Sequence, residues 1–333
     1  TTIIIALITY CLAPIVSTQP SWFYVMVIVT VLLLTELKHT FTEFAQRMKN
    51  DEMITLAKFL AISGIILPML PHKNLIPDIN LTPYSIWLAT VVVSGISYLS
   101  YLLKRYVFHE SGVLVSGIIG GLYSSTATIS VLARKSRKAS EQEANEYVAA
   151  MLLAVSMMFL RFMILILIFS REIFTSIYPY LLIMSVVAAV VAWFIHSRHR
   201  RSKDMADESE DEDSSNPLEF KVALIFATLF VVFTVLTHYT LVYAGTGGLN
   251  LLSFVSGLSD ITPFILNLLQ NTGSVAVLVV VACSMQAIIS NILVNMFYAL
   301  FFAGKGSKLR PWILGGFGTV IGVNLVLLLF FYL

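Results

Sequence analysis

Two ionisable side chains stand alone in long apolar stretches of the sequence. Arg161 is the only charged residue in the apolar run 147–170, and Asp260 is the only carboxylate side chain from Lys221 to the C-terminus. A charge near the centre of a bilayer costs at least roughly 2.5–3.5 kcal/mol on insertion scales, so both side chains are expected to face protein or water. Arg161 is a candidate for binding a substrate anion or for pairing with Asp260. Asp260 is a candidate for binding a coupling proton or cation, or for capping a helix.

Small polar residues gather around these two charges. Hydroxyls follow the glycine pair of GIIGG, a glycine and hydroxyls surround Asp260, and two asparagines four residues apart share a helix face. The predicted substrate-binding residues are Ser124, Ser125, Thr126, Thr128, Arg161, Gly257, Ser259, Thr262, Asn291 and Asn295, with Asp260 as the ion-coupling residue. The alternative is a structural role, because hydroxyls and amides also satisfy helix backbones and join helices inside membranes.

Other chemistry finds little support among the residues. No histidine pair has metal-ligand spacing, Cys11 and Cys283 both lie in apolar runs, and neither a phosphate-binding loop nor a serine-nucleophile motif is present. An enzyme would need a nucleophile, a base and an orienting group within reach of one another, and the sequence offers no convincing trio. We therefore expect no enzyme activity, no catalytic residue, no metal and no cofactor.

The composition indicates the class of protein. Of 333 residues, 58% are hydrophobic and 12% are charged, about half the charged fraction of an ordinary soluble domain. The 21 basic and 19 acidic residues nearly balance, which argues against a nucleic-acid partner. The sequence therefore predicts an all-α polytopic membrane protein.

Nine apolar stretches approach the roughly 20 residues that a membrane-spanning helix needs. They are 1–16, 21–36, 52–70, 83–104, 147–170, 173–196, 218–243, 274–303 and 311–333. Two more, 111–134 and 247–270, are long enough but are interrupted by glycines and small polar residues. The first stretch begins at once, without the basic start of a signal peptide, so we expect a further segment upstream.

Basic residues distinguish two arrangements of the interrupted stretches. If every stretch crosses the membrane, the basic loops divide between the two sides, against the positive-inside rule. If 111–134 and 247–270 are re-entrant hairpins, all the basic loops share one side; these loops are 38–49, 104–105, 134–138, 198–203 and 305–310. The sequence therefore predicts about nine transmembrane helices plus two re-entrant helical hairpins.

The chain also carries an internal repeat. Pro83 corresponds to Pro217 at an offset of 134, and Gly121 corresponds to Gly257 at an offset of 136. A hairpin counts as no crossing, so each repeat makes three crossings and the second is inverted relative to the first. Inverted repeats with broken helices are typical of secondary transporters, which bind substrate near the midplane. The predicted organisation is N-terminal helices in 1–79, a first repeat in 80–196, a charged cytoplasmic loop in 197–215 and a second repeat in 216–333.

Several segments resemble one known family. GGLYSSTATISVLARKSR, SMMFLR, NPLEFKVALIFA and GLSDITPF are similar to bacterial MgtC/SapB-family membrane proteins, in the C-terminal part that is a domain of unknown function. The resemblance implies a bacterial inner-membrane protein in which an MgtC-like segment precedes this region. By motif, the family's small-residue signature falls on Ser124, Ser125 and Thr126, its intramembrane arginine on Arg161, its Asn-Pro pair on Asn216 and Pro217, and its GL-x-D motif on Gly257, Leu258 and Asp260.

Two positions depart from that family's pattern. Thr262 stands where the family commonly has a second acidic residue, and Asn295 stands in the span where it often has a lysine after an asparagine. A site that binds Mg²⁺ between paired carboxylates is therefore weakened in this chain.

These features favour a secondary-type transporter of a small anionic or zwitterionic solute, coupled to a proton or cation, in the bacterial inner (plasma) membrane. The alternative is a non-transporting, MgtC-like regulator that acts through helix–helix contacts with another membrane complex. The expected partners are the solute or ion and the lipid bilayer, and a homo-oligomer is left open.

Overall fold

The computed structural model describes most of the chain from Asn50 onward. The described residues are 21–36, 50–76, 79, 81–108, 112–137, 139, 141–197, 220–270, 275–304 and 309–332, with isolated positions before residue 21. Most of the predicted span 1–16, and nearly all of the loops 38–49, 197–215 and 305–310, lie outside the described residues. The chain divides into two compact units, Thr1–Ala61 and Ile62–Leu333, and each is described by itself.

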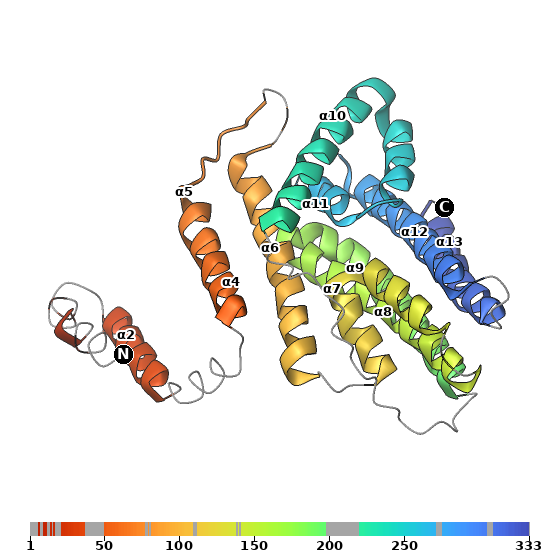
Figure 1. The fold of residues 1–333 in the computed structure, drawn as a ribbon. Helices are drawn as coiled ribbons and strands as arrows, with labels where there is room; N and C mark the ends of the chain where they lie inside the picture. Colours follow the sequence, from red (N-terminus) through yellow and green to blue (C-terminus); the bar gives the residue numbers. More distant parts are fainter. Residues whose placement is uncertain are drawn as a thin grey trace. The chain divides into compact units, whose positions relative to one another are not determined.

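The named elements of the described residues are all helices. They are α2 (Ser21–Glu36), α4 (Asn50–Ala61), η1 (Ile62–Ile66), α5 (Leu67–Met69), α6 (Pro83–Leu102), η2 (Leu103–Val107), α7 (Val113–Lys135), α8 (Glu141–Phe169), α9 (Arg171–Ser197), α10 (Phe220–Ser256), α11 (Thr262–Gln270), α12 (Val277–Ala303) and α13 (Arg310–Tyr332), shown in Figure 1. These residues contain no β-strand, only an isolated bridge between Ile76 and Ile79. The expectation of an all-α protein is confirmed.

Seven helices in this part of the chain are long and apolar enough to cross a membrane. Six of them, in α6 with η2, α8, α9, α10, α12 and α13, coincide with predicted spans, and the seventh is α7. The chain is therefore a polytopic membrane protein. Helix α2 has 16 residues, and the apolar helix Met53–Met69 is also shorter than the seven. The three N-terminal spans stay predictions.

Helix α7 is broken in its middle and folds back on itself. Ser124 has extended dihedral angles, φ −158° and ψ 107°. In a continuous helix, residues eight apart are separated by about 12 Å along the axis. A Cβ atom added to Gly120 would nevertheless lie 2.5 Å from Oγ1 of Thr128. The halves 113–123 and 125–135 therefore pack side by side, and each is about 16 Å long, roughly half the thickness of a hydrocarbon core.

Helix α10 is also broken, at Gly245. Its φ of +60° and ψ of −152° are a backbone conformation that glycine adopts and other residues rarely do. Figure 1 shows α10 as two arms that meet at this break. The shorter arm, 246–256, is followed by the non-helical residues 257–261 and then by α11. The stretch 247–270 thus consists of two half-length helices around a central turn.

Helices α12 and α8 are the most buried of the seven, with 67% and 50% of their apolar windows inside the protein. Small residues permit close packing against α8. A Cβ atom on Gly117 would collide with the backbone of Ala150. Ser156 of α8 also donates to the carbonyl oxygen of Ser185 in α9 at 2.8 Å. Small and hydroxyl-bearing residues at such interfaces are typical of helix packing in membranes.

Two contacts join the ends of helices that are far apart in the sequence. Nη2 of Arg137 donates to the carbonyl oxygen of Phe301 at 3.1 Å, so the end of α7 lies beside the end of α12. Nε2 of Gln270 donates to the carbonyl oxygen of Ser85 at 3.4 Å, so the end of α11 lies beside the start of α6.

Candidate functional site

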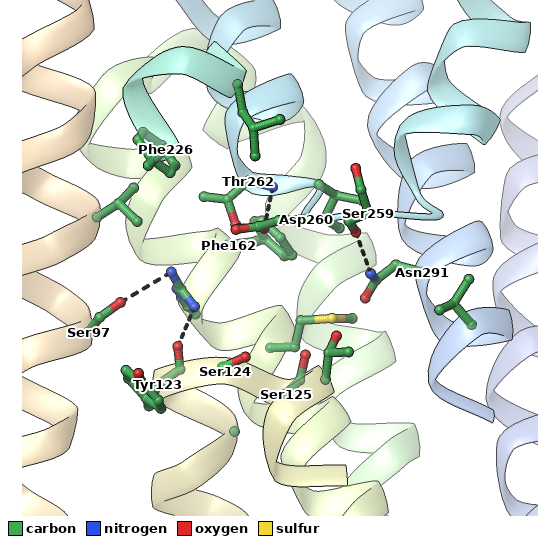
Figure 2. A pocket seen from close by; sticks show the side chains of 18 of the residues that line it. Ser97, Tyr123, Ser124, Ser125, Phe162, Phe226, Ser259, Asp260, Thr262 and Asn291 are labelled. Atoms are coloured by element: carbon green, nitrogen blue, oxygen red, sulfur yellow. Dashed lines mark hydrogen bonds between the residues drawn. The ribbon is translucent and has the colours of Figure 1, made fainter. Parts of the chain in front are cut away.

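A cavity of about 480 Å³ lies in the larger unit, between the break of α7 at Ser124 and the non-helical residues that connect α10 to α11. Residues 123–126 are here termed the Ser124 turn, and residues 257–261 the Asp260 turn. Figure 2 shows Tyr123 and Ser125 on one side of the cavity and Ser259 and Asp260 on the other. The rest of the wall comes from α6, α8, the first arm of α10 and α12, with Gly121 of α7 and Thr262 at the start of α11.

Ser124 begins the second half of α7. Its Oγ accepts a hydrogen bond from the backbone N–H of Ala127 at 3.4 Å, as an N-cap residue does. The first N–H groups of this half-helix therefore belong to residues that line the cavity, and they carry partial positive charge. The side chains of Ser125 and Thr126 line the cavity beside them.

Asp260 begins α11 in the same way. Its Oδ1 accepts hydrogen bonds from the backbone N–H of Thr262 at 3.0 Å and from Oγ1 of Thr262 at 2.7 Å. The rest of the carboxylate is exposed to the cavity. An anionic cap offsets the positive end of the helix, so the start of α11 is a poorer place for a second anion than the start of the half-helix after Ser124.

Close contacts around the two turns recur at the sequence offset that relates Gly121 to Gly257. A Cβ atom on Gly121 would lie 2.5 Å from Cα of Ala154, and a Cβ atom on Gly257 would lie 2.7 Å from Oγ of Ser290. Ser290 follows Ala154 by the same offset of 136. Each turn is therefore packed closely against the span that follows it.

A side chain from that following span also binds a backbone carbonyl of each turn. Nη1 of Arg161 donates to the carbonyl oxygen of Tyr123 at 2.7 Å. Nδ2 of Asn291 donates to the carbonyl oxygen of Ser259 at 3.3 Å. Tyr123 and Ser259 are again related by the offset of 136. The same backbone position is thus bound by a cation in the Ser124 turn and by a neutral amide in the Asp260 turn.

Arg161 is anchored without a carboxylate contact. Its Nη2 lies 3.4 Å from Oγ of Ser97, and its buried Nε has no partner in the described part of the chain. No ion pair joins Arg161 to Asp260 within those residues, although the two charges interact electrostatically. The cavity wall therefore carries a positive charge beside the Ser124 turn and a negative charge on the Asp260 turn.

Eight of the eleven predicted site residues line the cavity: Ser124, Ser125, Thr126, Arg161, Ser259, Asp260, Thr262 and Asn291. The other three lie nearby. Thr128 packs against Gly120, Gly257 packs on α12, and Asn295 is buried and donates to Oδ1 of Asn291 at 3.1 Å. The binding roles of all eleven stay predictions. Among the described residues, no three or more His, Cys, Asp or Glu side chains gather as a metal site would require.

The sequence reasoning missed the contribution of α6. Ser94 and Ser97 are buried and line the cavity. They are three residues apart and share one helix face. That polar stripe within the apolar stretch 83–104 is the signal that could have found them.

Comparison with known proteins identifies a family whose model covers the residues that line the cavity. The family model "Domain of unknown function (DUF4010)" matches residues 91–303, a range that contains every residue lining the cavity. A protein of Aquifex aeolicus (strain VF5), described as uncharacterized, is 27% identical over 221 residues, which are 66% of this chain and 94% of that protein. No solved structure matches the chain. Because the family model covers more than half of the chain, the chain belongs to the DUF4010 family.

Proposed function

We propose that the protein is a secondary-type transporter of a small anionic or zwitterionic solute, coupled to a proton or cation. The solute binds in the cavity between the Ser124 turn and the Asp260 turn. The observation that carries the proposal is that the Ser124 turn and the Asp260 turn line one cavity inside a membrane protein, beside an arginine that no carboxylate contacts in the described residues.

In this proposal 111–134 and 247–270 are re-entrant hairpins. The chain then makes about nine crossings, and its two repeats are inverted. The fold-back of α7 at Ser124 supports this, since each half is too short to cross alone. The contacts that recur at an offset of 136 support the duplication.

Contacts at the helix ends support the same topology. The bond between Arg137 and Phe301 joins the basic end of α7 to the end of α12, which is followed by the basic loop 305–310. If 247–270 crossed the membrane, an odd number of crossings would separate these two basic segments, and they would lie on opposite sides. The bond between Gln270 and Ser85 joins the end of α11 to the start of α6, the end away from Lys104 and Arg105. With 247–270 as a hairpin, a crossing α7 would place these two ends on opposite sides.

The basic segments then define the cytoplasmic face, because cytoplasmic loops carry the excess of Lys and Arg. Loop 197–215 lies on that face in this proposal. The resemblance to MgtC/SapB-family proteins adds the bacterial inner membrane as the location.

Arg161 and the half-helix after Ser124 supply the anion-binding chemistry. A guanidinium group and the free N–H groups at a helix start both favour an oxyanion, and neither needs a metal to do so. Half-helix starts that point at anionic groups are a recurring feature of substrate sites in secondary transporters. Asp260 supplies the opposite charge and takes part in coupling.

A thermal-shift screen of the purified full chain tests the proposal. Anions, amino acids, lipid head groups and divalent cations are compared on the wild type, Arg161→Ala and the control Arg171→Ala, whose side chain lies at the exposed start of α9. A true ligand at 100 times its Kd stabilises the folded state by about 2.7 kcal/mol. We expect one ligand class to shift the wild type and Arg171→Ala but not Arg161→Ala.

Two results would contradict the proposal. One is the absence of any ligand shift in the wild type, and the other is a shift that Arg161→Ala retains in full. A non-transporting regulator predicts that substitution of Arg161 and Asp260 leaves function intact. Its function would depend instead on lipid-facing or loop residues.

A further inference from the structure

The two turns share their geometry but differ in charge. At the N-cap, Ser124 is neutral where Asp260 is an anion. At the bound carbonyl, Arg161 is a cation where Asn291 is a neutral amide. A hydroxyl and an amide therefore suffice for the two backbone contacts that both turns make. The charges of Arg161 and Asp260 exceed what the turns require, and they are opposite in sign.

These two charges line one cavity without forming an ion pair in the described residues. An isolated charge within a membrane protein is costly unless a counter-charge balances it. An anion alone would leave Asp260 unbalanced, and a cation alone would leave Arg161 unbalanced. A solute that carries both charges balances both walls at once.

The rest of the wall indicates what lies between the two charges of the solute. Val93, Phe162, Phe226 and Leu229 contribute apolar surface from α6, α8 and α10. The volume of about 480 Å³ falls within the roughly 300–1,000 Å³ typical of small-molecule sites. The cavity therefore has room for an apolar body in addition to two charged groups.

We infer that the solute is a zwitterion of the L-amino-acid class with an apolar side chain. Its carboxylate binds Arg161 and the N–H groups that follow Ser124, and its ammonium group binds Asp260. This inference rests on the proposed function and specifies its substrate. The ammonium group is then the cation that Asp260 receives, in place of a separate inorganic cation.

Binding of matched analogues to the purified full chain tests the inference. The twenty L-amino acids are screened by thermal shift. The amino acid with the largest shift is then compared with two analogues, one lacking the amino group and one lacking the carboxylate, with and without NaCl. We expect the amino acid to bind at least roughly 10-fold more tightly than either analogue, because each analogue leaves one charged wall unpaired.

Two variants should lose the preference for the amino acid if its carboxylate binds Arg161 and its ammonium group binds Asp260. Asp260→Asn retains an N-cap residue and removes the charge, so the deaminated acid should bind it at least as tightly as the amino acid. Arg161→Gln should show the reverse preference, for the amine over the amino acid. Glu172→Gln, at the exposed start of α9, is the matched control and should behave as the wild type.

The outcomes separate this inference from the proposed function. The wild type could bind the deaminated acid as tightly as the amino acid, or could bind the deaminated acid only when NaCl is present. In either case the solute is an anion accompanied by a separate cation. The inference is then wrong while the transporter proposal stands. If neither amino acids nor their analogues nor any other class of the screen shifts the wild type, both are wrong.

Discussion

Ser124 and Asp260 are related by the same sequence offset of 136, and each caps the half-helix that follows it with a side-chain oxygen. Ser124 caps with a neutral hydroxyl, whereas Asp260 caps with a carboxylate. Either oxygen can accept the hydrogen bond from the backbone N–H. Substitutions at Asp260 can therefore distinguish the contribution of the cap to stability from the contribution of the negative charge to binding.

Asp260→Asn and Asp260→Ala should differ in stability but not in function. Asparagine caps a helix about as well as aspartate, so Asp260→Asn should stay within about 0.5 kcal/mol of the wild type. Asp260→Ala loses both hydrogen bonds from Thr262 and should be destabilised by about 0.5–2 kcal/mol. Both should bind the wild-type solute at least roughly 10-fold more weakly than the wild type does. Thermal unfolding in detergent and solute binding measure the two effects, and wild-type affinity in Asp260→Asn would exclude a role for the charge.

Gly121 and Gly257 should not tolerate a side chain. A methyl group on either would overlap the following span, so Gly121→Ala and Gly257→Ala should each lower the free energy of unfolding by about 1–3 kcal/mol. Gly318, in α13, has nothing within 4 Å of an added Cβ atom. The free energy of unfolding of Gly318→Ala should therefore equal that of the wild type or be higher by up to about 1 kcal/mol. Equal melting temperatures for all three variants would mean that the turns are not packed as described.

Arg161 should separate the need for a hydrogen-bond donor from the need for a charge. Arg161→Lys and Arg161→Gln both lose the bond geometry to Tyr123 and should each be destabilised by about 1–3 kcal/mol. Arg161→Lys retains the charge and should bind the solute within roughly 10-fold of the wild type, whereas Arg161→Gln should weaken binding by roughly 100-fold, or about 2.8 kcal/mol. Isothermal titration in detergent measures both affinities. Similar affinities for the two variants would show that the positive charge is not used.

Asn267 should contribute to stability and not to binding. It is fully buried and donates to the carbonyl oxygen of Phe233 at 3.2 Å and to Oγ1 of Thr237 at 2.8 Å, which joins α11 to α10. Asn267→Ala should cost about 1–3 kcal/mol, because two acceptors lose their donor. Thr319→Ala, on the exposed side of α13, should change stability by less than about 0.5 kcal/mol. A large change in solute affinity for Asn267→Ala would mean that α11 does more than support the Asp260 turn.

The helix breaks were predictable from the sequence, because glycines and short polar side chains have strong local preferences. GIIGG followed by SST predicts a reversal capped by a hydroxyl, and the break at Ser124 lies there. Likewise, the break at Gly245 lies between the predicted span 218–243 and the interrupted stretch 247–270. The apolar stretches from residue 83 onward also correspond to helices, since length and hydropathy suffice to identify them.

The wall of the cavity could not be predicted in the same way. Which face of a helix meets the cavity depends on its rotation against its neighbours, and that is decided by close contacts such as the one between Gly121 and Ala154. Ser97 therefore lines the cavity although it was not among the predicted site residues. Asn295 lies one turn after Asn291, but the cavity wall on α12 continues through Val294 and Tyr298, so the side of the helix that meets the cavity passes beside Asn295.

Access to the cavity from the two faces of the membrane tests the central claim most directly. Thr126→Cys and Leu258→Cys place one thiol on each side of the cavity, in a Cys11→Ser, Cys283→Ser background, and Trp193→Cys on the exposed apolar face of α9 is the unreactive control. The variants are labelled with a membrane-impermeant maleimide in right-side-out and in inverted vesicles. We predict that both cavity thiols react from both faces, because one cavity opens to each side in turn. Labelling of Thr126→Cys from one face only and of Leu258→Cys from the opposite face only would contradict this account.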